Sequence, residues 1–248
     1  MYENPWLVLL RHPEETLHFC HGTLISNRFV LTTATCGNTV VTNRLATAYE
    51  QPTEIVLGEH DLHTDPDCVT ASNCSLPATK RLIDSVIVHQ NFSTDSYEND
   101  IALLFMNESV QFGNTIQPIC LPLTSIVDDT DLHMQTIYNT VWSVENTPRQ
   151  IWMRHVPIAM CRKQLQNIIT LKEGQICARI FRKDFIDLDG TAGSALQVDY
   201  DGRIFQYGIL SLGFPSDVDK APYVYSDVAK YINWIHSTLL LESLTDKT

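Results

Sequence analysis

The 248-residue sequence lacks any apolar run long enough to cross a membrane. It also lacks an excess of positive charge, because 17 basic and 29 acidic side chains give a formal net charge of −12. A surface of this charge repels phosphate backbones and anionic lipid headgroups. We therefore expect no nucleic-acid partner and no membrane partner, and we interpret the negative charge as a source of solubility.

The chain has no recognisable signal peptide at its start. The apolar segment Trp6–Leu10 is short, no basic stretch precedes it, and no small-residue cleavage site follows it. Its composition is typical of a strand. A secretion signal has therefore been removed, lies upstream of Met1, or is absent.

The cysteines do not form a zinc-binding pattern, since there is no CxxC pair and no Cys/His cluster with suitable spacing. Three close pairs suit local disulfides: Cys20 with Cys36, Cys68 with Cys74, and Cys161 with Cys177. Disulfides imply an oxidising compartment. Cys120, the seventh cysteine, is either a buried free thiol or the partner of a segment outside this sequence.

Short runs that alternate apolar and polar residues, separated by turn residues, predict a β protein. Such runs occupy residues 29–32, 54–57, 84–88, 101–105 and 208–212. Many short strands of this kind favour a barrel or a sandwich. Helical periodicity appears only near the end, where an apolar stripe from Val228 to Ile235 follows Ser226 and Asp227.

Three asparagines, Asn73, Asn91 and Asn107, begin Asn-x-Ser sequons and are candidate N-glycosylation sites. Together with the cysteine pairs, they predict a secreted, extracellular glycoprotein.

Five segments, in the same order along the chain, resemble the chymotrypsin/trypsin-like serine protease family. Residues 19–25 resemble the family motif F-C-G-G-[ST]-L-I, and residues 31–36 resemble L-T-A-A-H-C. Residues 99–104 match N-D-I-A-L-L fully, and residues 117–122 match Q-P-[IV]-C-L-P. Residues 223–235 resemble the last strand and the C-terminal helix of the family. The resemblance implies an all-β fold of two antiparallel six-stranded β-barrels within one domain, residues 1–248. We expect the barrels at about 1–108 and 122–225 and a C-terminal α-helix at about 226–240.

The segment Leu57–Leu62, followed by Cys68 and Cys74, is similar to the arthropod clip-domain branch of that family. That branch has a small disulfide loop at this place, which would account for the Cys68/Cys74 pair. The resemblance also implies that Cys120 is bonded to an N-terminal clip segment, although no clip domain is recognisable in the sequence.

The family's chemistry needs a serine nucleophile, a histidine base and a carboxylate that orients the histidine. The resemblance places the base position at Thr35, and threonine cannot accept a proton at physiological pH. The carboxylate position is Asp100. Residues 190–196 correspond to G-D-S-G-G-P-L, so Ala192 occupies the nucleophile position. The triad is therefore predicted to be degenerate.

Neighbouring positions also lack residues that an active member of the family needs for activation and for substrate binding. Thr191 replaces the aspartate that pairs with the freed N-terminus, and the start at Met1 lacks the I-V-G-G end. Gly190 retains one oxyanion-hole position, but without the ion pair we expect no formed hole. Ile186 stands where a trypsin-like pocket has its aspartate, and Leu188 replaces a cysteine that flanks that pocket.

Two rival interpretations stay open at this point. A shift of the alignment would make Ser194 the nucleophile, with His21 or His60 recruited as base, in an active secreted endopeptidase with a displaced triad. The second rival is a microbial-surface or carbohydrate binder, for which the sequence shows neither a basic patch nor an aromatic cluster.

Glu59 and Asp61 lie where a calcium loop would begin, but no later carboxylate completes a cage, so we predict no metal and no cofactor.

The resemblance implies the function of a catalytically inactive serine protease homologue. Such a protein binds proteases, zymogens or other homologues and acts as a cofactor or regulator in an extracellular cascade. The clip-type resemblance points to immune cascades, including prophenoloxidase activation.

Overall fold

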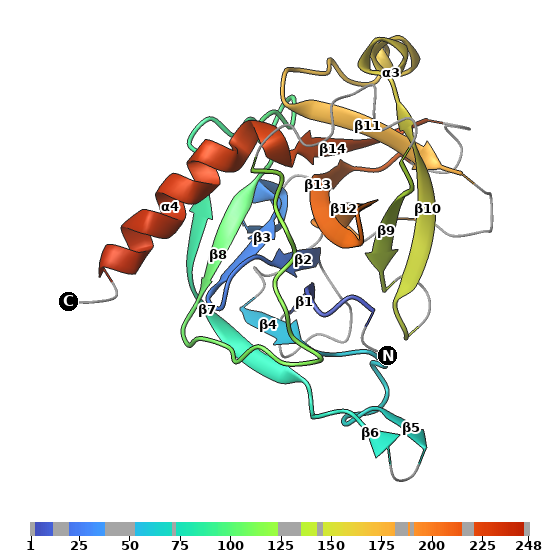
Figure 1. Ribbon diagram of the computed structural model, residues 1–248. Helices are drawn as coiled ribbons and strands as arrows, with labels where there is room; N and C mark the ends of the chain where they lie inside the picture. Colours follow the sequence, from blue (N-terminus) through green and yellow to red (C-terminus); the bar gives the residue numbers. More distant parts are fainter. Residues whose placement is uncertain are drawn as a thin grey trace.

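Two closed antiparallel β-barrels, each of six strands, form the body of the protein, as the family resemblance implied (Figure 1). The computed structural model describes residues 3–11, 20–37, 53–70, 73–123, 135–142, 146–181, 188, 191–214 and 221–245. No helix within these residues is long and apolar enough to cross a membrane.

The first barrel has the strand order β1-β2-β3-β8-β7-β4. Its strands are β1 (Leu7–Arg11), β2 (Cys20–Leu24), β3 (Phe29–Thr32), β4 (Glu54–Leu57), β7 (Thr79–Val88) and β8 (Ala102–Met106). Aliphatic side chains from every strand of this barrel meet in its interior, with Leu10, Leu24 and Leu104 fully buried among them. This burial explains why the strand segments are rich in apolar residues.

The second barrel repeats the closed arrangement in the order β10-β11-β14-β13-β12-β9. Its strands are β9 (Ile137–Val141), β10 (Arg149–Val156), β11 (Gln175–Ile180), β12 (Ala195–Tyr200), β13 (Arg203–Leu212) and β14 (Tyr223–Asp227). In β10, buried Ile151 and Met153 alternate with exposed Trp152 and Arg154. The alternation directs one set of side chains into the barrel and the other to its outer face.

The remaining elements lie outside the barrels. They are the hairpin β5 (Cys68–Thr70) and β6 (Asn73–Cys74), the helices α1 (Ala34–Gly37), α3 (Ile158–Leu165) and α4 (Ile232–Thr245), and the 3₁₀ turn η1 (Val228–Tyr231). Figure 1 shows the hairpin projecting from the first barrel and α4 running beside β7 and β8. Tyr231 and Ile235 pack there against apolar residues of β3 and β8.

The C-terminal helix begins and ends later than the expected 226–240. Ser226 and Asp227 are the last residues of β14, because they pair with Ile209 and Gly208 of β13. The Asp227 side chain then accepts a hydrogen bond from the Ala229 amide and opens η1. The regular α-helix therefore starts only at Ile232.

All three suggested cysteine pairs are bonded in the structure. The Cα atoms are 6.0 Å apart in Cys20–Cys36, 3.9 Å in Cys68–Cys74 and 6.4 Å in Cys161–Cys177. The closest pair joins directly opposed residues of the β5–β6 hairpin. The Cys20–Cys36 bond ties β2 to α1, which carries one of the candidate site residues.

β2 of the first barrel contacts the turn before β12 of the second barrel. The His21 amide donates to the Ala192 carbonyl oxygen at 2.8 Å. Gly193 follows with a positive φ of 84°, a conformation that glycine adopts without strain. A Cβ atom on Gly193 would overlap the His21 carbonyl oxygen and lie 2.5 Å from Thr32 Oγ1. Only glycine permits this contact.

We therefore expect Gly193→Ala to lower the free energy of unfolding well beyond the cost of its φ angle. The matched control is Gly202→Ala in the β12–β13 turn, where φ is 73° and no atom lies within 4 Å of the new Cβ. The control should lose about 1 kcal/mol from backbone strain, and Gly193→Ala about 2 kcal/mol more from the overlap. Urea unfolding of the disulfide-bonded proteins measures both losses, and equal losses would contradict the close contact.

Candidate functional site

Asp100 is a fully buried carboxylate between the two barrels, two residues before the start of β8 at Ala102. Its Oδ1 accepts hydrogen bonds from the Thr35 amide at 2.8 Å and from the Thr35 hydroxyl at 2.9 Å. Its Oδ2 accepts one from the Ser211 hydroxyl at 2.6 Å. The Ser226 hydroxyl donates to the Asp100 backbone oxygen at 2.7 Å. The carboxylate thus joins α1 of the first half to β13 of the second, and the backbone oxygen adds β14.

Thr35 is positioned by the short helix α1. The Thr33 side chain accepts a hydrogen bond from the Cys36 amide at 3.2 Å, as a helix N-terminus requires. The Cys20–Cys36 disulfide holds the other side of the turn. Together these contacts direct both donors of Thr35 at Asp100.

The protonation of Asp100 is strongly affected by its surroundings. Burial raises its pKa to about 6, while the hydrogen bonds from Ser211 and Thr35 act in the opposite direction. A threonine hydroxyl can donate to the carboxylate but does not take up protons near neutrality. The Thr35–Asp100–Ser211 group is therefore a set of satisfied hydrogen bonds in which no imidazole takes part.

The turn before β12 holds the other predicted positions. Thr191 is buried and its hydroxyl donates to the Leu188 backbone oxygen at 2.7 Å. Ala192 is partly exposed, and its methyl group packs against the core of the first barrel. The structure brings Ala192 to the junction of the two barrels, next to β2. Ile186 and Gly190 lie outside the described residues.

Ser194 points into the second barrel. It is fully buried, and its hydroxyl accepts a hydrogen bond from Asn139 Nδ2 at 2.8 Å. The Tyr225 hydroxyl donates to the Asn139 Oδ1 at 3.0 Å. The Ser194 hydroxyl is therefore part of a buried hydrogen-bond chain with Asn139 and Tyr225.

The two histidines considered as replacement bases have other contacts. His21 is fully buried, its Nε2 accepts from the Trp142 amide at 3.2 Å, and its ring lies 5.9 Å from the Trp142 ring. The His60 amide donates to Asp67 Oδ2 at 3.1 Å. Among the described residues, no hydrogen bond joins either imidazole to Thr35 or Asp100.

The loop that begins with Glu59 and Asp61 is organised around Asp67. Oδ2 of Asp67 accepts from the amides of His60 and Asp61, and its Oδ1 accepts from the Thr64 hydroxyl. Burial, followed by the nearby Asp67 charge, raises the pKa of Glu59 to about 7. No group of three potential metal ligands occurs in the part of the chain that the structure describes.

The remaining predicted positions are on the surface or close to it. Cys120 is unbonded and partly exposed, and its backbone oxygen accepts from the Gln206 amide at 2.9 Å. The sequon residues Asn73, Asn91 and Asn107 are all exposed, as a glycosylated side chain must be.

Sequence reasoning missed Ser211, Ser226 and Asn139. All three are polar residues in strands whose neighbours are buried. A serine inside the apolar run 209–212 is the one local signal that could have drawn attention to Ser211, because a buried polar group needs a partner.

Two closed barrels with a carboxylate between them define the chymotrypsin-like class of proteins. The comparisons with known proteins agree, because the family model described as Trypsin matches residues 1–235. The chain belongs to the trypsin family.

The chain is similar to arthropod clip-domain serine proteases. Serine protease grass of Drosophila melanogaster is 29% identical over 260 residues, which cover 97% of this chain and 66% of that protein. CLIP domain-containing serine protease HP8 of Bombyx mori is 29% identical over a region that covers 96% of this chain and 66% of that protein. The crystal structure of the Drosophila Grass clip serine protease of the Toll pathway superposes with a TM-score of 0.76 at 27% identity, over 96% of this chain and 70% of that one. The chain spans about two thirds of the length of these curated relatives.

The raised pKa of Asp100 predicts a pH dependence of stability. The folded state binds the Asp100 proton more tightly than the unfolded state, so stability falls as the pH rises from about 4 to about 6. Asp100→Asn removes this penalty while keeping an acceptor for Thr35. Relative to the parent, Asp100→Asn should therefore be more stable to unfolding at pH 7 than at pH 4. The difference between the two pH values should reach up to about 3 kcal/mol.

Urea unfolding at pH 4, 5, 6 and 7 measures this difference. Asp84→Asn, at an exposed carboxylate of β7, controls for the loss of one negative charge. A difference between parent and Asp100→Asn that does not change with pH would contradict the prediction.

Proposed function

We propose that this chain is a non-catalytic serine protease homologue that acts by binding other proteins. The observation that carries the proposal is the contact of Thr35 with Asp100, in which a threonine occupies both hydrogen-bonding positions on Oδ1. Proton transfer to and from the nucleophile needs a group that titrates near neutral pH. Thr35 fills the space next to the carboxylate without supplying that chemistry.

The neighbourhood of Ala192 supports the same conclusion. Its methyl group has no nucleophilic atom and contributes to packing against the first barrel. The next hydroxyl after Ala192 in the sequence is that of Ser194, which is buried and accepts a hydrogen bond from Asn139. Within the described residues, no histidine or carboxylate is hydrogen-bonded to Ser194, which weighs against the displaced triad.

The turn at 191–194 is also held by neutral contacts. The Thr191 amide and hydroxyl both donate to the Leu188 oxygen, and the Gly193 amide donates to the Leu210 oxygen at 2.9 Å. The Thr191 side chain is buried, so an aspartate there would be a buried charge that needs a partner. These contacts favour a turn whose shape does not depend on an ion pair made after cleavage.

The proposed role is that of a cofactor or regulator in an extracellular protease cascade, with proteases, zymogens or other homologues as partners. The similarity to clip-domain proteases supports a cascade role, and one of those relatives is described as a Toll-pathway protease. Three disulfides and three exposed sequon asparagines support secretion. We propose Cys120 as the attachment point of an N-terminal clip segment.

The purified protein should not react with a serine-directed fluorophosphonate, because both nucleophile and base positions lack the required groups. Gel fluorescence beside active trypsin measures labelling, and hydrolysis of a broad peptide library provides a second readout. Ser194→Ala is the matched variant. Labelling of the parent that disappears in Ser194→Ala would establish the displaced triad and overturn the proposal.

Affinity capture from the native extracellular fluid should recover proteases, zymogens or their homologues, identified by mass spectrometry. The control bait is trypsin with its serine blocked, which has the same fold and a different surface. Recovery of the same proteins by both baits, or of no cascade protein by this chain, would contradict a specific regulatory role.

A further inference from the structure

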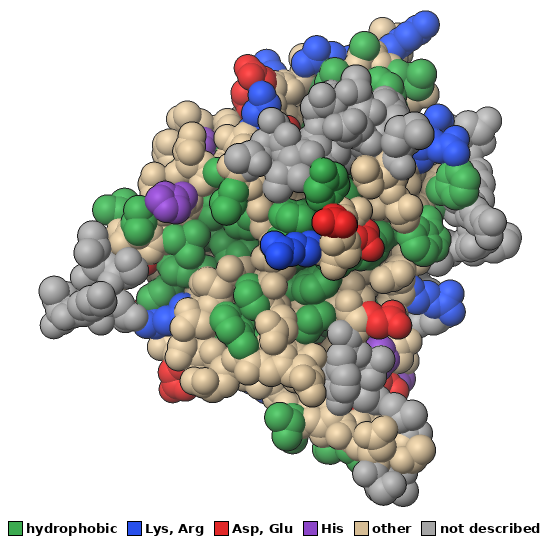
Figure 2. All heavy atoms as spheres, in the orientation of Figure 1, with side chains coloured by type: hydrophobic (Ala, Val, Ile, Leu, Met, Phe, Trp, Pro, Cys, Tyr) green, Lys and Arg blue, Asp and Glu red, His purple; other side chains and the backbone are tan. Residues whose placement is uncertain are grey.

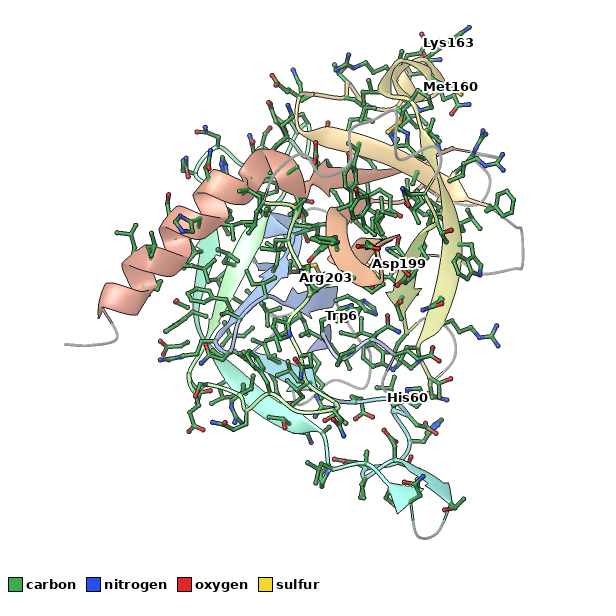
Figure 3. All side chains as sticks on the ribbon, in the orientation of Figure 1. Trp6, His60, Met160, Lys163, Asp199 and Arg203 are labelled. Carbon is green, nitrogen blue, oxygen red and sulfur yellow. A yellow bond between two sulfur atoms is a disulfide. The ribbon has the colours of Figure 1, made fainter. Side chains whose placement is uncertain are left out.

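The outer face of the second barrel carries a shallow hollow that the proposed function does not use. It has a volume of about 450 Å³ and is lined by Gln135, Thr136, Tyr138, Gln150, Trp152 and Asp199. This volume is within the range of small-ligand sites, roughly 300–1,000 Å³. Figure 3 labels Asp199, which lies at this face of the second barrel.

The strand register explains why these residues meet. Tyr138 of β9 lies opposite Trp152 of β10 on one side and opposite Gln197 of β12 on the other. Asp199 follows two positions after Gln197 and therefore points to the same face.

The polar groups of the hollow are largely unused. Neither the side chains of Gln135, Thr136 and Gln150 nor the indole N–H of Trp152 makes a hydrogen bond within the described part of the chain. Asp199 uses one carboxylate oxygen to accept from the Gly202 amide at 3.1 Å. Several donors and acceptors at one place are therefore available to a ligand.

Trp152 provides a flat apolar surface beside these groups. Its side chain is 47% exposed although the residue lies in the middle of β10. The Tyr138 ring packs against it at 5.7 Å between centroids and supports it from the side. Burial raises the pKa of Tyr138 to about 12, so its hydroxyl keeps its proton as a donor.

The apolar surface extends beyond Trp152. The Phe181 amide donates to the Trp152 oxygen at 2.8 Å, and the Arg154 guanidinium lies 4.5 Å above the Phe181 ring. Phe181 is 52% exposed. Tyr138 in β9, Trp152 in β10 and Phe181, directly after β11, thus form a row of aromatic residues, which we call the aromatic row.

The chemistry of the hollow selects among ligand classes. An anionic ligand would meet Asp199 and a protein of net charge −12. An extended peptide that adds a strand would need a free sheet edge, and the barrel is closed. Amide and hydroxyl side chains both donate and accept, as sugar hydroxyls do. The C–H face of a sugar ring, in turn, can pack on an exposed indole through dispersion.

A second hollow next to the first leaves room for a ligand of several units. It has a volume of about 300 Å³, shares Gln150 with the first and continues to Glu59 and His60. Figure 2 shows charges of both signs scattered over this side of the molecule, without a large area of one sign. A long neutral ligand therefore meets no continuous charged barrier on this side.

We propose that the outer face of the second barrel between β9, β10 and β12 binds a neutral oligosaccharide, with Trp152 as the platform for a sugar ring. The site is separate from the Asp100 region. Its test is therefore independent of whether the chain is catalytically inactive.

The test is calorimetric titration of the whole protein with chitohexaose, laminarihexaose and mannohexaose, with heparin hexasaccharide as the anionic comparison. At least one neutral sugar should bind, and heparin should not. Trp152→Ala should weaken that binding by about tenfold or more, while Trp152→Phe should retain most of it. The matched control Phe112→Ala removes an aromatic side chain of similar exposure, 48%, outside the hollow and should leave binding unchanged.

Three outcomes would overturn the proposal. These are an absence of binding to all three neutral sugars at millimolar concentration, equal binding by parent and Trp152→Ala, and stronger binding of heparin than of the neutral sugars. Circular dichroism of Trp152→Ala establishes that it is folded. Gln150→Ala, which removes one unpaired amide, is a second variant that should weaken binding without altering the aromatic row.

Discussion

The buried carboxylate of Asp100 is the interaction on which the junction of the two barrels depends. A charge without solvent must be satisfied by donors, and here the donors come from α1 on one side and β13 on the other. Its backbone oxygen adds a contact to Ser226 in β14. The same carboxylate would orient a base in an active member of the family. With Thr35 as its neighbour, our proposal leaves it the task of holding two halves of the molecule together.

The junction has a second, sterically determined part. The turn at 191–194 approaches β2 so closely that Gly193 has no room for a side chain, and the His21 amide bonds to Ala192 at the same place. These contacts are backbone contacts, so they survive changes of side chain at Thr191 and Ala192. A family architecture can therefore persist after the groups needed for its chemistry have been replaced.

Polar side chains at the junction of the barrels and on the outer face of the second barrel differ in their hydrogen bonding. Inside, the Asp100 carboxylate and the Ser194 hydroxyl are hydrogen-bonded to other side chains of the protein. On the outer face, the side chains of Gln135, Thr136 and Gln150 make no hydrogen bond to another described residue, and Trp152 is left half exposed. Ligand sites typically combine aromatic or apolar side chains with a few polar groups that orient the ligand. The binding capacity that we propose therefore lies away from Asp100 and its partners.

The sequence by itself determined the fold class, through its resemblance to the trypsin family, and the three disulfide pairings, through short cysteine spacings. The same resemblance predicted Thr35, Asp100 and Ala192 as the triad positions. It placed the C-terminal helix too early, since strand pairing of Ser226 and Asp227 competes with their helix-starting tendency. Only the tertiary structure identified Ser211 as the partner of Asp100 and brought Tyr138 beside Trp152. Barrel closure joins residues far apart in the chain, and no local pattern records which of them will meet.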